Sequence, residues 1–212
     1  MFEDRNKAGA QLAEQLKEYK GDSIVLALPR GGVVIGFEIA KALKVPLDVI
    51  VVRKIGAPHN PELGIGAVSE SNTKVLDGSA IKLLGIPRRV ISEMIRREKE
   101  ELRRRVAVYR NNKPLKTLKN RTVIIVDDGL ATGATARAAI RAVKKHKPKQ
   151  LIFAAPVCES NTARGIEHLV DKILCIEAPS NFAAVGQWYR NFEQVSDEEV
   201  VALLKLYKNP KV

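Results

Sequence analysis

The feature that most constrains the fold is the segment Val123–Thr135, which reads Val-Ile-Ile-Val-Asp-Asp-Gly-Leu-Ala-Thr-Gly-Ala-Thr. Its apolar start, Val123–Val126, predicts a strand buried on both faces, as in a parallel sheet. Two carboxylates, Asp127 and Asp128, follow this strand, then a loop of small residues, then an Ala-rich helix expected from about Ala134 to Lys145. A helix that begins in such a loop presents unpaired N–H groups and its positive dipole end to an anion.

The residues of this loop favour a sugar phosphate as the ligand. Small residues at Gly129, Ala131 and Gly133 let the backbone approach an anion closely, and the hydroxyls of Thr132 and Thr135 can bond phosphate oxygens. Carboxylates beside a phosphate make sense if they accept from sugar hydroxyls or help to hold a divalent cation. The simpler alternative is a solvated turn after a strand. An NTPase strand would need a Gly-Lys phosphate loop elsewhere, and the chain contains no Gly-Lys pair.

This block resembles the binding motif for 5-phosphoribosyl 1-diphosphate (PRPP) of the type I phosphoribosyltransferases, in which two acidic residues precede a short loop ending in Thr-Gly-x-Thr. The resemblance implies transfer of 5-phosphoribosyl from PRPP to a nitrogenous base, with Mg²⁺ held mostly by substrate and water. The resemblance also implies that the protein forms a homo-oligomer, a dimer. The residues expected to bind the ribose 5-phosphate are Asp127, Asp128, Gly129, Leu130, Ala131, Thr132, Gly133, Ala134 and Thr135.

The order of apolar segments predicts an α/β fold, a doubly wound parallel sheet with helices on both faces. The expected strands are Ile24–Leu28, Leu47–Val52, Val123–Val126, Leu151–Ala155 and Ile173–Ile176. The expected helices are Arg5–Lys20, Val33–Leu43, Pro87–Tyr109, Ala134–His146, Asn161–Val170 and, after Ser196 as N-cap, Asp197–Tyr207. We expect one domain over residues 1–212, with a core at about 21–176 and a small hood from about 1–20 and 177–212.

One segment, Ile55–Lys74, interrupts the alternation of strands and helices. Its glycines and prolines predict a loop that leads into a β-hairpin. In the family that the motif resembles, a flexible loop in this place closes over the active site.

Two further segments are expected to contact the diphosphate. Pro29, Arg30, Gly31 and Gly32 follow the first strand, where glycines permit close approach of an anion and Arg30 can donate to two oxygens; the alternative is an ordinary strand-to-helix turn. Arg53 and Lys54 follow the second strand and suit a leaving diphosphate, unless they are surface charges. Arg30, Lys54, Asp127 and Asp128 are the expected catalytic residues, and His59 is a weaker candidate acid.

The base is expected to lie near Val157 and under the hood, whose aromatic residues Phe182, Trp188 and Tyr189 could stack on it or only pack the hood onto the core. In members of the family that act on 6-oxopurines, the phosphate loop carries an Asp that faces the purine. Ala131 stands in that position here, so the acceptor base stays open.

The chain has a net charge of +12, which suits a polyphosphate substrate but also leaves RNA binding open. The basic segment Arg88–Arg105 predicts an amphipathic surface helix and supports the alternative, a PRPP-sensing regulator that binds RNA. Cys158 and Cys175 lack metal-ligand spacing and are expected to be buried thiols in a reducing cytoplasm. We expect no membrane segment, because the start of the chain has no apolar signal and no apolar run is long enough.

Overall fold

The computed structural model describes residues 1–70 and 73–208. Its helices are α1 (Arg5–Glu14), η1 (Lys17–Tyr19), α2 (Gly31–Leu43), α3 (Gly78–Leu83), α4 (Arg88–Arg110), α5 (Ala134–Lys144), α6 (Ser160–Glu167), η2 (Val185–Trp188) and α7 (Asp197–Lys208). Its strands are β1 (Ser23–Ala27), β2 (Leu47–Val49), β3 (Val52–Ala57), β4 (Asn60–Ser69), β5 (Lys74–Leu76), β6 (Thr122–Val126), β7 (Gln150–Val157) and β8 (Lys172–Glu177).

A parallel sheet in the order β2-β1-β6-β7-β8 forms the centre of the molecule. Successive side chains of a strand point to opposite faces, so Ile124 and Val126 join one core while Val123 and Ile125 join the other. All four are fully buried. The predicted doubly wound α/β fold is therefore confirmed.

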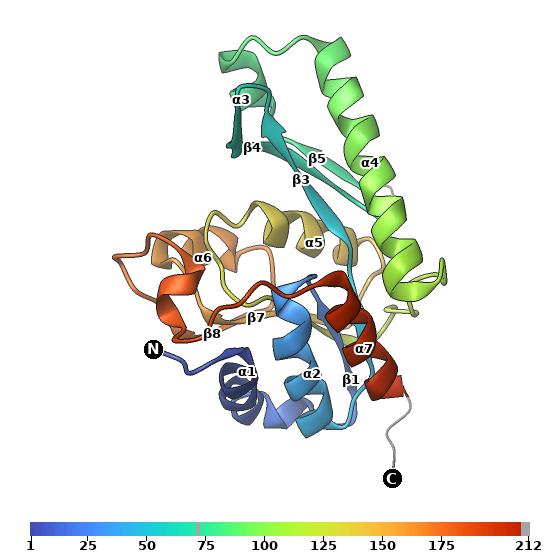
Figure 1. The fold of residues 1–212 in the computed structure, drawn as a ribbon, viewed down its shortest axis with the longest axis vertical. Coiled ribbons are helices and arrows are strands. Elements are labelled where there is room, and N and C mark those ends of the chain that lie inside the picture. Colours follow the sequence, from blue (N-terminus) through green and yellow to red (C-terminus); the bar gives the residue numbers. More distant parts are fainter. Residues whose placement is uncertain (71–72, 209–212) are drawn as a thin grey trace.

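Helices cover both faces of this sheet (Figure 1). Buried side chains of α1, α2 and α7, such as Leu12, Ile39 and Leu204, pack on one face. Those of α5 and α6, such as Ile140 and Ile166, pack on the other. The predicted cap of α7 is confirmed, because the Ser196 hydroxyl accepts from the backbone N–H of Glu199 at 3.1 Å.

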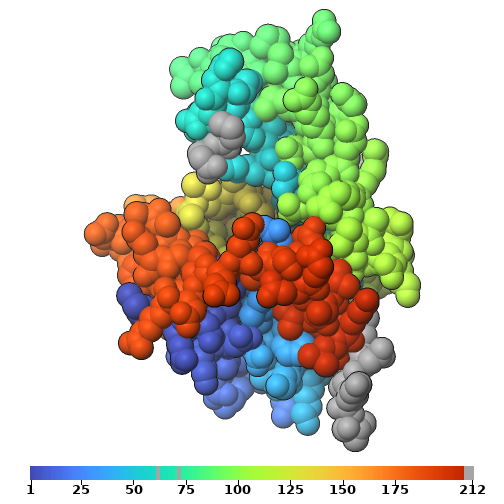
Figure 2. All heavy atoms as spheres, in the orientation of Figure 1, coloured from blue at the N-terminus to red at the C-terminus, as the bar shows by residue number. Residues whose placement is uncertain are grey.

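A second, antiparallel sheet in the order β3-β4-β5 rises from the parallel sheet together with α3 and α4 (Figure 1). We call these elements the projecting unit. In the space-filling view the C-terminal part of the chain, orange to red, crosses the molecule below it (Figure 2). The start of the chain contacts this part, since Phe2 pairs with Tyr189 and its backbone N–H donates to Trp188 O at 2.7 Å.

The β-hairpin predicted within Ile55–Lys74 is confirmed, but the loop expected to lead into it is strand instead. β3 and β4 form a continuous hairpin that turns at Pro58 and His59. Its glycines serve close packing, because a Cβ at Gly66 would lie 2.5 Å from the carbonyl oxygen of Val75 on the adjacent strand. Positions 71 and 72 of the predicted segment lie outside the described residues.

Other boundaries also differ from those expected. The expected strand Leu47–Val52 is divided between the two sheets, and the backbone N–H of Val51 at the crossing donates to Glu70 Oε1 at 2.9 Å. The expected N-terminal helix ends at Glu14 and a short 3₁₀ turn follows it. The sequence pattern did not indicate β5 or α3.

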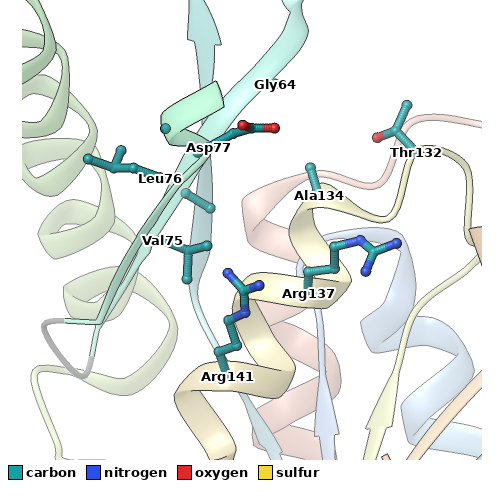
Figure 3. A pocket seen from close by; sticks show the side chains of 11 residues that line it. Gly64, Val75, Leu76, Asp77, Thr132, Ala134, Arg137 and Arg141 are labelled. Atoms are coloured by element: carbon teal, nitrogen blue, oxygen red, sulfur yellow. The ribbon is translucent and has the colours of Figure 1, made fainter. Parts of the chain in front are cut away.

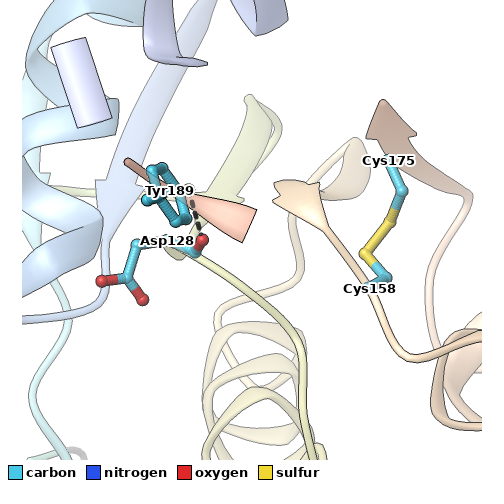
Figure 4. The surroundings of a disulfide bond; sticks show 4 residues. All are labelled: Asp128, Cys158, Cys175 and Tyr189. Atoms are coloured by element: carbon cyan, nitrogen blue, oxygen red, sulfur yellow. Dashed lines mark hydrogen bonds between the residues drawn. A yellow bond between two sulfur atoms is a disulfide. The ribbon is translucent and has the colours of Figure 1, made fainter. Parts of the chain in front are cut away.

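Cys158 and Cys175 form a disulfide, so the expectation of two free thiols is wrong (Figure 4). The bond joins the end of β7 to its parallel neighbour β8, and the two Cα atoms are 6.1 Å apart. The cysteines therefore give no support to a reducing compartment. Within the described ranges, no helix has the length and apolar character needed to cross a membrane.

Candidate functional site

A cavity of about 420 Å³ lies at the carboxyl ends of β1 and β6, where ligands bind in doubly wound sheets. We call it the carboxylate cavity. It is bordered by six of the residues expected from the sequence: Pro29, Arg30, Gly31, Asp127, Asp128 and Thr135. Arg5 and Phe192, which the sequence did not indicate, border it as well.

The expected phosphate loop, between β6 and α5, is hydrogen-bonded to the last residue of β7 and to the turn that follows it. Leu130 donates its N–H to Val157 O at 2.8 Å, and its carbonyl accepts from Glu159 N at 2.7 Å. Gly133 has a φ of +72°, a backbone conformation that strains residues with a side chain. A Cβ there would also lie 2.7 Å from Thr162 Cγ2, so both the backbone and the packing favour glycine. α5 begins at the next residue, so its unpaired N–H groups open into this loop.

Thr132 and Ala134 face a different space from Thr135. They border a second hollow of about 450 Å³ between α5 and the projecting unit, together with Gly64, Arg137 and Arg141 (Figure 3). The phosphate loop therefore separates two hollows, and only Thr135 of its two threonines borders the cavity with the carboxylates.

The two carboxylates are close neighbours with different partners. Asp127 Oδ1 accepts from the backbone N–H of Asp128 at 2.9 Å, whereas Asp128 Oδ2 accepts from Arg5 Nε at 2.8 Å. Burial, and then the charge of Asp128, raise the pKa of Asp127 well above its ordinary value. Burial also raises the pKa of Asp128, but Arg5 opposes this rise. Ligand hydroxyls or a cation would relieve this crowding of negative charge.

The loop after β1 packs directly against the loop after β6. A Cβ on Gly31 would lie 1.8 Å from Asp128 Oδ2, and one on Gly32 would lie 2.7 Å from Val126 O. The Gly-Gly pair is thus required for contact between the two loops. The peptide bond between Pro29 and Arg30 is cis.

Arg30 has an acidic neighbour that the sequence did not indicate. Its Nη1 lies 4.0 Å from Asp197 Oδ1, at the start of α7. Asp197 also accepts from Arg104 Nη2 at 3.1 Å and from the Tyr109 hydroxyl, both on α4. Burial alone would raise the pKa of Asp197, but these two hydrogen bonds lower it. Asp197 therefore joins Arg30 to the projecting unit.

Arg53 and Lys54 lie on β3 and do not border the carboxylate cavity. Arg53 Nε is 2.7 Å from Glu98 Oε2 on α4, and the stem of Lys54 lies beside Gly64. His59 lies exposed in the hairpin turn. The roles expected for these three residues stay predictions.

The residues expected at the base are less open than the prediction requires. Val157 and Tyr189 are buried, and Phe182 and Trp188 are half-buried. The Tyr189 hydroxyl donates to the backbone carbonyl of Asp128 at 2.6 Å (Figure 4), which gives this ring a supporting contact below the site. Phe192 is the aromatic residue that borders the carboxylate cavity.

Comparison with known proteins places these features in a family. A family model described as a phosphoribosyl transferase domain matches residues 2–193. A Mycobacterium tuberculosis protein with the provisional name phosphoribosyl transferase Rv0571c is 42% identical over 205 residues; the match covers 96% of this chain and 46% of that protein. The chain thus spans about half the length of this curated relative.

Solved structures agree with this result. The crystal structure of the protein TT1426 from Thermus thermophilus superposes with a TM-score of 0.84 at 38% identity, covering 98% of this chain and 99% of that one. A purine phosphoribosyltransferase from Pyrococcus horikoshii shares the fold, with a TM-score of 0.51 at 19% identity over 91% of this chain and 92% of that one. The chain belongs to the phosphoribosyltransferase family.

Proposed function

We propose that the protein transfers the 5-phosphoribosyl group of PRPP to a nitrogen of a base and releases diphosphate. The observation that carries this proposal is the contact between the two loops at the carboxylate cavity. It brings the start of α5, Asp127, Asp128 and Arg30 to one space. A ligand with a phosphate, a sugar diol and a diphosphate matches these three chemistries.

Each group has a role in this mechanism. The loop and the start of α5 hold the 5-phosphate, while Asp127 and Asp128 accept hydrogen bonds from the ribose hydroxyls. The bond between the anomeric carbon and the diphosphate breaks ahead of bond formation, which leaves the sugar with oxocarbenium character. Arg30 and the glycine backbone beside it stabilise the negative charge of the leaving diphosphate.

Mg²⁺ fits this donor set, because Asp127 and Asp128 offer hard carboxylate oxygens beside a polyphosphate site. Residues 1–70 and 73–208 hold no cluster of three or more His, Cys, Asp or Glu that could bind a metal. Such an ion would therefore be held mainly by the oxygens of PRPP and by water. When bound, Mg²⁺ neutralises charge on the leaving diphosphate.

The acceptor base is open. Ala131 stands where 6-oxopurine enzymes of the family have an Asp, which argues against that class of acceptor. The test is a panel of purine and pyrimidine bases, each with PRPP and Mg²⁺, followed by thermal shift and by diphosphate release. We expect one base to stabilise the protein only when PRPP and Mg²⁺ are both present.

Two matched variants separate this proposal from an RNA-binding regulator. We expect Arg30→Ala to abolish diphosphate release and Arg103→Ala, an exposed charge on α4, to leave it unchanged. Much of the charge on α4 is already paired, since Arg89, Arg96 and Arg105 each contact a Glu four residues away. We therefore expect only salt-sensitive RNA binding at about 10⁻⁴–10⁻⁶ M. Tight binding of one structured RNA, with no diphosphate released from PRPP in the presence of any base, would refute the proposed enzyme activity.

A further inference from the structure

Arg5 is the most unusual side chain near the carboxylate cavity outside the two loops. It begins α1, yet its side chain is only 10% exposed. Its Nε lies 2.8 Å from Asp128 Oδ2, and its Nη1 donates to the backbone carbonyl of Glu193 at 2.8 Å. The guanidinium therefore joins the start of α1 and the segment before α7 to the second acidic residue of the PRPP motif.

Aromatic rings fix this guanidinium in place. The Arg5 Cζ atom lies 3.8 Å from the centre of the Phe192 ring and 6.0 Å from that of Tyr189. Tyr189 in turn donates to the Asp128 carbonyl. Asp128 is thus held at its carboxylate by Arg5 and at its backbone by the ring that packs beside Arg5.

The positive charge of Arg5 offsets the negative charge that gathers at this site. Two adjacent, largely buried carboxylates must face a ligand that carries several negative charges. A buried charge that loses its partner is strongly destabilised, and its side chain turns toward water or toward another donor. Arginine suits this place better than lysine, because its planar group can stack on Phe192 while it bonds in two directions.

We propose that Arg5 is a positioning residue of the PRPP site, which holds the Asp128 carboxylate where it accepts from the ribose. This inference rests on the proposed function. It predicts that Arg5 acts through Asp128 and makes no independent contribution to ligand binding.

A double-mutant cycle on PRPP affinity tests this point. With Mg²⁺ present, we expect Arg5→Met to weaken PRPP binding roughly tenfold or more, the scale of hydrogen bonds to charged groups. Arg5→Met combined with Asp128→Asn should bind within about twofold of Asp128→Asn alone, because the two changes remove one interaction. Lys7→Met, an exposed charge on the same helix, is the matched control and should leave affinity unchanged.

Arg5→Lys gives a second readout that a merely structural role would not produce. It retains the charge without the planar fork, so we expect both its affinity for PRPP and its melting temperature to lie between those of Arg5→Met and the unmodified protein. Additive losses in the double variant would overturn the inference, since Arg5 would then act independently of Asp128.

A second double-mutant cycle, measured by melting temperature, needs no ligand. Arg5→Met removes the contacts with Phe192 and Glu193 both in the unmodified protein and in the Asp128→Asn variant. The difference between its effects on the two melting temperatures therefore isolates the contact with Asp128. We expect Arg5→Met to lower the melting temperature by several degrees more in the unmodified background than beside Asp128→Asn. If the unmodified protein bound no PRPP, the proposed function would fail, and this cycle alone would decide whether Arg5 positions Asp128; equal shifts in both backgrounds would refute it.

Discussion

Replacement of Gly31 by Ala would test the contact between the two loops with a single methyl group. The added Cβ would lie 1.8 Å from Asp128 Oδ2, 2.6 Å from its Cγ and 2.8 Å from Arg5 Nε. Because real Cβ contacts essentially never fall below 3.0 Å, the carboxylate or the loop must move by more than about 1 Å. The 2.8 Å bond between Arg5 and Asp128 cannot survive such a shift unchanged.

Two magnitudes follow from this displacement. Overpacking of a tight contact costs about 1–3 kcal/mol of unfolding free energy. Displacement of a charged hydrogen-bond acceptor costs about 1.5–3 kcal/mol in PRPP binding, which is roughly a 10- to 150-fold loss of affinity. Denaturant unfolding measures the first quantity, and calorimetry with PRPP and Mg²⁺ measures the second.

Gly78→Ala is the matched control for this change. Gly78 begins α3, and a Cβ there would meet nothing within 4 Å. The control should retain PRPP affinity and keep or slightly raise stability, because alanine restricts the unfolded chain. If Gly31→Ala behaved like Gly78→Ala in both assays, the tight packing of the two loops would be refuted.

Four other predictions concern the same site and its supports. Asp128→Asn should weaken PRPP binding by about 1.5–3 kcal/mol in calorimetry, and unchanged affinity would contradict the ribose contact. Because burial and then Asp128 raise the pKa of Asp127, the folded state binds a proton more tightly than the unfolded state. Unfolding free energy should therefore fall as pH rises from about 4 through that raised pKa, and Asp127→Asn should make this fall smaller in a stability–pH profile. Reduction of the disulfide, which spans 17 residues, should lower unfolding free energy by about 3 kcal/mol, whereas Cys175→Ser should not respond to reductant. Limited proteolysis should cut the chain within residues 55–74 more slowly when PRPP and Mg²⁺ are present, and equal rates would argue against closure of this segment over the ligand.

The sequence could predict the parts of the site that are continuous in the chain. The strand, carboxylates, loop and helix of Val123–Thr135 are consecutive, so their local pattern determines both structure and chemistry. The same holds for Pro29–Gly32, where a strand ends and a helix begins. In both cases the side chains that border the cavity come from the strand end or from the first turn of the helix.

The rest of the site depends on contacts that no local pattern encodes. Arg5 and Asp128 are separated by 123 positions, and Asp197 meets Tyr109 across 88. The disulfide was missed because β7 and β8 become neighbours only once the strand order is known. The glycines of residues 55–74 predicted a loop because a glycine that permits strand packing, as Gly66 does, looks in sequence like one that permits a flexible loop.

Asp197 joins the projecting unit to the expected diphosphate loop. Its carboxylate lies between Arg30, on the expected diphosphate loop, and the pair Arg104 and Tyr109 on α4. α4 also contacts the hairpin, because Arg53 Nε on β3 lies 2.7 Å from Glu98 Oε2 on α4. If Arg30 binds the diphosphate as we propose, an Asp197 that stays bonded to α4 would leave Arg30 freer to turn toward it, whereas an Asp197 released from α4 would compete with the diphosphate for Arg30. Under this proposal the charge of Arg30 would be shared between substrate and protein, and the contacts of α4 with Asp197 would set the share.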